Sequence, residues 1–125
     1  MQATNTTTMN ITTTEKPSFN NPKKTLVCSS VHFPEAGANT VSQSGRALSK
    51  WSKGLTVNVY QVKGASAPHS FEVYTDDENQ YAEGCLGFHE NVLEDYDGCF
   101  SLPYQVMDVL DALGYCTKDI RESLS

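Results

Sequence analysis

Long apolar runs are missing from this chain of 125 residues, and only 38% of its residues are hydrophobic. A membrane-spanning helix needs about 20 consecutive apolar residues, so the sequence predicts no transmembrane segment. The N-terminus also lacks the basic start and the apolar stretch of roughly 7–15 residues that mark a secretory signal. We therefore expect a cytoplasmic protein that has no membrane contact.

Catalytic and nucleotide-binding signatures are missing as well. The chain has no Walker phosphate loop, dinucleotide fingerprint, nucleophile elbow or His-Glu-x-x-His motif. Its nine basic residues are scattered, and its isoelectric point of about 4.9 is the reverse of a nucleic-acid-binding footprint. These absences favour a non-catalytic protein that uses no cofactor and does not contact nucleic acid directly.

Basic side chains are absent from Glu72 to Asp111, a segment that carries eleven carboxylates. Residues 1–64 have a net charge of +5 and residues 65–125 a net charge of −11, so the total of −6 hides a polarised molecule. A block of one sign repels itself in the folded chain. The block is a solvated surface, a docking surface for a basic protein, or the clustered carboxylates of a metal-dependent hydrolase, although no His–Asp or Asp-x-Asp array supports the last of these.

Four cysteines are present, and without a secretory signal we expect them to be free and largely buried thiols. Two Cys-x-x-x-His pairs, Cys28 with His32 and Cys85 with His89, contain residue types that bind zinc. Both pairs lie in runs that indicate strands, where side chains four apart are separated by about 13 Å. One zinc ion needs ligands within about 2.3 Å, so we predict no metal site.

The alternation of apolar and polar residues predicts a sheet. Strands are expected over residues 25–33, 55–62, 71–75 and 81–89. Two shorter apolar runs should flank a tight turn at Asp97-Gly98. Residues 1–22 hold few apolar side chains, so we expect a flexible tail in which the Thr runs can form a β-like stretch. Residues 23–125 are expected to form a single domain.

Helical periodicity is clearest between Pro103 and Leu113. Its apolar residues at i, i+3, i+4 and i+7 are Val106, Val109, Leu110 and Leu113. Gly114 should end this helix in a left-handed conformation, and Thr117 should cap a last short turn. A weaker helix is expected over Thr40–Trp51. The predicted fold is α+β, an antiparallel sheet of four to six strands packed against one main C-terminal helix, with a second short helix and the flexible tail.

The predicted binding surface is an acidic rim that also carries tyrosine. Its residues are Asp76, Asp77, Glu78, Glu90, Glu94, Asp95, Tyr96 and Asp97. Aromatic groups beside charges suit an interface, and complementary charge steers association with a basic partner. We predict an inhibitor or adaptor that docks onto a basic, nucleic-acid-handling protein. Phage proteins that block host defence and immunity proteins that block nucleases are analogous classes.

Two other classes stay open at this point. A small enzyme or ligand-binding domain would use a pocket between sheet and helix, with Cys, His and carboxylate side chains converging in it. A self-associating structural protein would expose an apolar sheet edge or face and form a homodimer.

Overall fold

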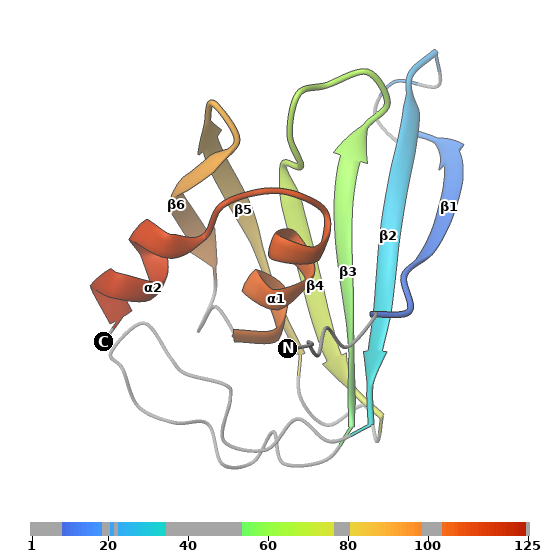
Figure 1. The fold of residues 1–125 in the computed structure, drawn as a ribbon. Coiled ribbons are helices and arrows are strands. Elements are labelled where there is room, and N and C mark those ends of the chain that lie inside the picture. The colour runs from blue at the N-terminus through green and yellow to red at the C-terminus, as the bar shows by residue number, and fades with distance from the viewer. Residues whose placement is uncertain are drawn as a thin grey trace, which may run out of the picture.

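One antiparallel sheet with two short helices makes up the described protein, which confirms the predicted α+β class (Figure 1). The computed structural model describes residues 9–18, 21, 23–34, 54–76, 81–98 and 104–124. Each strand pairs with its neighbour in sequence, in the order β1 to β6. The elements are β1 (Thr12–Pro17), β2 (Thr25–Phe33), β3 (Leu55–Val62), β4 (Ser70–Thr75), β5 (Tyr81–His89), β6 (Val92–Gly98), α1 (Tyr104–Ala112) and α2 (Lys118–Leu124).

The hydrophobic core lies between the sheet and the two helices. Strand pairing places Val57 between Val31 and Val73, and all three side chains are buried. The α1 side chains Val109 and Leu110 belong to the same cluster and are fully buried. Each such side chain contributes roughly 1.5–3 kcal/mol when it leaves water. Because strand residues alternate between faces, one side of the sheet supplies the core and the other does not.

The end of α1 follows the sequence prediction. Gly114 adopts a φ of 102°, a left-handed conformation that glycine enters without steric cost. Its N–H donates to the carbonyl of Asp111, and the N–H of Tyr115 donates to the carbonyl of Leu110, both at 3.0 Å. These two bonds form a Schellman motif, which satisfies carbonyls at the helix end and reverses the chain. Gln105 is also buried, so the packed face of α1 is wider than the predicted stripe.

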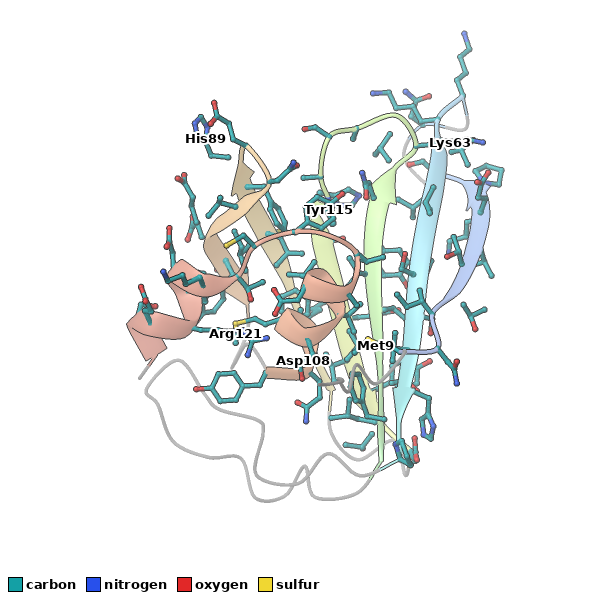
Figure 2. All side chains as sticks on the ribbon, in the orientation of Figure 1. Met9, Lys63, His89, Asp108, Tyr115 and Arg121 are labelled. Atoms are coloured by element: carbon teal, nitrogen blue, oxygen red, sulfur yellow. The ribbon has the colours of Figure 1, made fainter. Side chains whose placement is uncertain are left out.

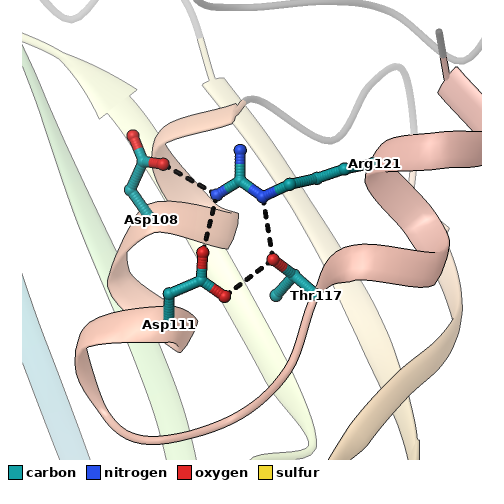
Figure 3. A network of polar contacts seen from close by, with 4 residues as sticks. All are labelled: Asp108, Asp111, Thr117 and Arg121. Atoms are coloured by element: carbon teal, nitrogen blue, oxygen red, sulfur yellow. Dashed lines mark hydrogen bonds and ion pairs between the residues drawn. The ribbon is translucent and has the colours of Figure 1, made fainter.

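An ionic cluster joins α2 to α1 (Figure 3). The Arg121 Nη2 donates to Asp108 Oδ1 at 2.8 Å and to Asp111 Oδ2 at 2.9 Å, while its Nε donates to Thr117 Oγ1 at 2.9 Å. Thr117 in turn donates to Asp111 Oδ1 at 2.7 Å. Burial lowers the pKa of Arg121, but the two carboxylates outweigh burial and raise it. Two of the eleven carboxylates of the acidic block therefore share one arginine, which offsets one of their two negative charges within the chain.

The predicted turn at Asp97-Gly98 is wrong. Both residues belong to β6, where Asp97 pairs with Cys85 of β5. The chain turns instead at Glu90 and Asn91, whose φ values of 51° and 69° fit a two-residue hairpin of type I′. Asn tolerates the left-handed region because its short side-chain amide forms hydrogen bonds with the nearby backbone. The residue that indicated the real turn was therefore Asn91.

A bulge bends β6 just after this hairpin. Phe88 pairs with Leu93 and Gly87 pairs with Asp95, so Glu94 is the extra residue on β6. The loop between the helices then covers the first part of the same strand. The N–H of Leu93 donates to the carbonyl of Cys116 at 2.8 Å, and the N–H of Cys116 donates to the carbonyl of Asn91. Bulges and such coverage keep an edge strand from pairing with other chains.

The structure differs from the predicted flexible tail at Thr12–Pro17. These residues form β1, an exposed edge strand that pairs with β2 along its whole length. Met9 and Ile11, just before β1, pack against the core, and Glu15 accepts a bond from Lys63 at 3.2 Å. The few apolar residues of this segment cannot by themselves offset the entropy lost when it becomes ordered. The backbone hydrogen bonds to β2 and the contacts of Met9, Ile11 and Glu15 supply the rest.

Some expectations lie outside the described residues. The predicted helix over Thr40–Trp51 is one of these, and the start of the Pro103 helix is another. In the part of the chain that the structure describes, neither helix has the length and apolarity needed to cross a membrane.

Candidate functional site

The side of the sheet opposite α1 and α2, which we call the outer face, is polar. Every second side chain of each strand lies on this face, because alternate residues point away from the core. Two cross-strand rows are central to it. The first row is Asn58, Glu72 and Glu83, and the second is Tyr60, Ser70, Cys85 and Asp97. The same strands therefore supply apolar groups to the core and carboxylates to the outer face.

Acidic side chains gather on one half of the outer face. Glu72, Glu83, Asp95 and Asp97 come from three adjacent strands, β4 to β6. All of these except the half-buried Glu72 are exposed. Glu72 and Glu83 are direct cross-strand partners, an arrangement of like charges that destabilises a sheet by roughly 0.2–1 kcal/mol. Lys16 lies on the same face, but on β1 at the other edge.

Hydrogen bonds orient the Glu72 carboxylate. The Tyr60 hydroxyl donates a hydrogen bond to its Oε1, and the Asn58 Nδ2 donates to the same oxygen at 2.9 Å. Burial raises the pKa of Tyr60, and the bond to Glu72 raises it further, so the phenol stays protonated at neutral pH. Burial also raises the pKa of the Cys28 thiol, which adjoins Tyr60. Neither group is prepared to act as a nucleophile at neutral pH.

A hollow of about 520 Å³ opens on the outer face between the two rows. It exists because Ser70 and Cys85, whose side chains are short, lie between larger side chains on this face. Tyr60 on β3 and Asp97 on β6 stand at its two sides, about 14 Å apart across three strand spacings. Its lining consists of Tyr60, Ser70, Phe71, Glu72, Glu83, Gly84, Cys85 and Asp97. The arrangement offers carboxylates and one aromatic ring to a ligand, and no basic group.

The structure brings together only part of the sequence-predicted surface. Asp95 and Asp97 lie on the outer face with the acidic pair of β4 and β5. Tyr96 points the other way, because it pairs with the buried Leu86 and packs against the core. That burial raises the pKa of Tyr96. Glu94 is exposed at the bulge, beside the acidic half but outside the two rows.

The remaining predicted residues lie apart from this group. Glu90 is at the tip of the β5–β6 hairpin, next to His89, at the end of the sheet where Figure 2 labels Lys63. Asp76 follows the opposite end of β4, where both of its carboxylate oxygens are 3.0 Å from His32 Nε2. Asp77 and Glu78 lie outside the described residues. The described members therefore do not form one continuous rim.

Sequence reasoning missed the centre of the acidic half. Tyr60, Glu72 and Glu83 are not adjacent in sequence, and only strand pairing makes them neighbours. Alternation could have placed each of them away from the core, since each follows or precedes a buried residue on its strand. Pairing register was the missing information, because a shift of one residue would exchange the two faces.

The cysteine expectations are partly corrected. Cys28, Cys85 and Cys116 are free, but Cys28 is only half-buried and the other two are exposed. Cys85 is exposed because it belongs to the outer face, which its apolar sequence neighbours did not reveal. Both Cys-x-x-x-His pairs lie on strands, β2 and β5. Among the residues that the structure describes, no three His, Cys, Asp or Glu side chains are grouped so that they could hold a metal ion.

Comparison of the chain with protein families, with characterised proteins and with solved structures finds no match. The function must therefore be argued from the geometry of the outer face.

Proposed function

We propose that this protein is a non-catalytic inhibitor or adaptor that works in the cytoplasm by docking its outer face onto a basic protein. One observation carries the proposal: four carboxylates, Glu72, Glu83, Asp95 and Asp97, share one face of three adjacent strands. Carboxylates that gather on a face that supplies nothing to the core can attract a basic partner by their combined charge. The proposed partner handles nucleic acid, because such proteins expose surfaces rich in Lys and Arg.

Electrostatics supports a partner of this charge. Glu72 and Glu83 are direct cross-strand partners, and their like charges repel each other in the folded chain. A cation that binds beside both carboxylates would replace this repulsion with attraction. A field of one sign also steers a basic protein during its approach and raises the association rate. Tyr74, 37% exposed on the same face, adds an aromatic group of the kind enriched in interfaces.

The chemistry of the hollow favours binding over catalysis. Its lining contains no histidine, and the Tyr60 phenol is held in its neutral form. The hollow also lies on the outer face, whereas the enzyme hypothesis expected a pocket between sheet and helix. Inhibitors of phage defence and nuclease-immunity proteins are analogous classes that use acidic docking surfaces without chemistry of their own.

The decisive experiment combines partner capture with a charge-matched pair of variants. A partner isolated from a host lysate is purified, and its dissociation constant is measured at 50 mM and 500 mM salt. Glu83→Gln with Asp97→Asn removes two charges from the outer face, and Asp119→Asn with Glu122→Gln removes two exposed charges from α2. We expect the first pair to weaken binding about tenfold or more and the second to change it less than about twofold.

Salt gives the second criterion. Screening lengths fall from roughly 14 Å to 4 Å between these salt concentrations, so binding through the outer face should weaken strongly. An affinity that does not change with salt contradicts the proposal. So does a folded Glu83→Gln/Asp97→Asn variant that binds as tightly as the wild type.

A further inference from the structure

We infer that the hollow on the outer face is the docking site for an arginine side chain of the basic partner. The inference rests on the proposed function, and it names the group that the acidic face recognises. The hollow combines three features that suit a guanidinium: a wall of carboxylates, an aromatic wall and a floor of small residues.

The carboxylate wall is built from three strands. Glu72, Glu83 and Asp97 all line the hollow and come from β4, β5 and β6 respectively. Glu72 is fixed in place, since Tyr60 and Asn58 both donate to its Oε1. Because Oε1 already accepts these two bonds, Glu72 contributes negative charge in a fixed position, and the paired N–H bonds of a guanidinium would go to Glu83 or Asp97.

The aromatic wall is Tyr60, and it already contacts a cation from within the chain. The Lys16 Nζ lies 5.9 Å from the centroid of the Tyr60 ring, within cation–π range. The ring also borders the hollow, so it can take part in a second contact from the side of β4. Between this ring and Asp97, Ser70 and Cys85 leave room because their side chains are short.

Arginine fits this site better than lysine for geometric reasons. A guanidinium is planar, stacks on an aromatic ring and forms paired hydrogen bonds with a carboxylate. An ammonium is a point charge that keeps its water more firmly and gains less from a fixed carboxylate plane. The acidic half as a whole attracts both residue types, so preference between them reports on the hollow alone.

Two fluorescent peptides of equal charge, hexa-arginine and hexa-lysine, test the inference on the full chain at 50 mM salt. We expect the wild type to bind hexa-arginine at least about fivefold more tightly than hexa-lysine, because only arginine gains from stacking and paired bonds. Tyr60→Leu removes the ring and should abolish the preference while hexa-lysine binding persists. Glu83→Gln/Asp97→Asn should also abolish it, and Asp119→Asn/Glu122→Gln should preserve it.

The outcomes separate the two proposals. Equal, salt-sensitive binding of both peptides overturns the arginine site and leaves the acidic docking face standing. A preference that survives in both hollow variants also overturns it, because the arginine would then bind elsewhere. Binding of neither peptide contradicts both proposals. If Tyr60→Leu fails to fold, the Glu83→Gln/Asp97→Asn variant tests the arginine site alone. Both of its substitutions are at exposed positions, so it removes no buried group.

Discussion

The two faces of the sheet are made by the same strands and have opposite characters. On the helix face, Leu55, Val57 and Val73 are fully buried, whereas their strand neighbours on the outer face are Asn58, Glu72 and other polar groups. The helix face gains energy from every residue it buries. The outer face includes a direct Glu–Glu pair that costs energy. Most of the apolar burial that stabilises the fold therefore lies on the helix face, whereas the outer face gathers carboxylates of like charge.

The largest expected effect comes from the helix face. Leu110→Ala removes a fully buried side chain from the centre of the core. The loss of burial and the resulting cavity should lower the free energy of unfolding by about 2–5 kcal/mol. That is a large part of the roughly 5–15 kcal/mol typical of a small domain. Urea denaturation measures it, and a loss below about 1 kcal/mol would contradict the position of the core.

A smaller effect is expected where α2 is joined to α1. Arg121→Ala removes bonds to Asp108 and Asp111 and leaves the buried Thr117 hydroxyl without one of its partners (Figure 3). Because the charged groups are partly exposed, we expect a loss of only about 1–2 kcal/mol. Lys118→Ala, an exposed change on the same helix, is the control and should stay within about 0.5 kcal/mol. Equal losses in the two variants would show that the cluster is not structural.

The outer face should behave in the opposite way from the core. Glu83→Gln with Asp97→Asn removes negative charge beside Glu72, so the free energy of unfolding should stay level or rise by up to about 0.5 kcal/mol. Chemical denaturation beside the peptide-binding measurement gives both quantities. A loss of more than about 1 kcal/mol would mean that these carboxylates support the fold, and the contrast between the faces would fail.

The smallest effect is a pH dependence at Tyr60. Burial and the bond to Glu72 raise the pKa of this phenol above its ordinary value of 10. The folded state then holds the proton more tightly than the unfolded chain does. Its contribution to stability is complete below pH 10 and is lost as the pH rises above that value. Between pH 9 and pH 11 the wild type should therefore lose more stability than Tyr60→Phe does, and parallel losses would contradict the assignment.

Much of the fold was predicted from local sequence, whereas the centre of the acidic half was not. Alternation predicted β2 and β3 with their bounds, and the apolar stripe with Gly114 predicted α1 and its end. The β5–β6 turn was misplaced because Asp97-Gly98 is the stronger turn signal, although Asn91 occupies the real turn. β1 was predicted only as a β-like stretch at the Thr runs of a flexible tail. Its six residues are all exposed, so pairing with β2 holds the strand and no apolar pattern indicates it.

The candidate site was predicted only in part for a physical reason. Asp95 and Asp97 were found because they belong to a dense run of charge, but Glu72 and Glu83 are each the single acid of their strand. Their importance arises from register, which sets Glu72 beside Glu83 and Cys85 beside Asp97. Local patterns do not encode which residues of separate strands will face one another.

The central claim is that the outer face binds a basic partner while the helix face holds the fold. Amide chemical-shift mapping of the full chain with hexa-arginine at 50 mM salt tests it most directly. The account predicts shifts at Glu72, Glu83, Cys85 and Asp97, with the amides of α1 and α2 unmoved. Shifts concentrated on the helices, or no shifts at any peptide concentration, would contradict it.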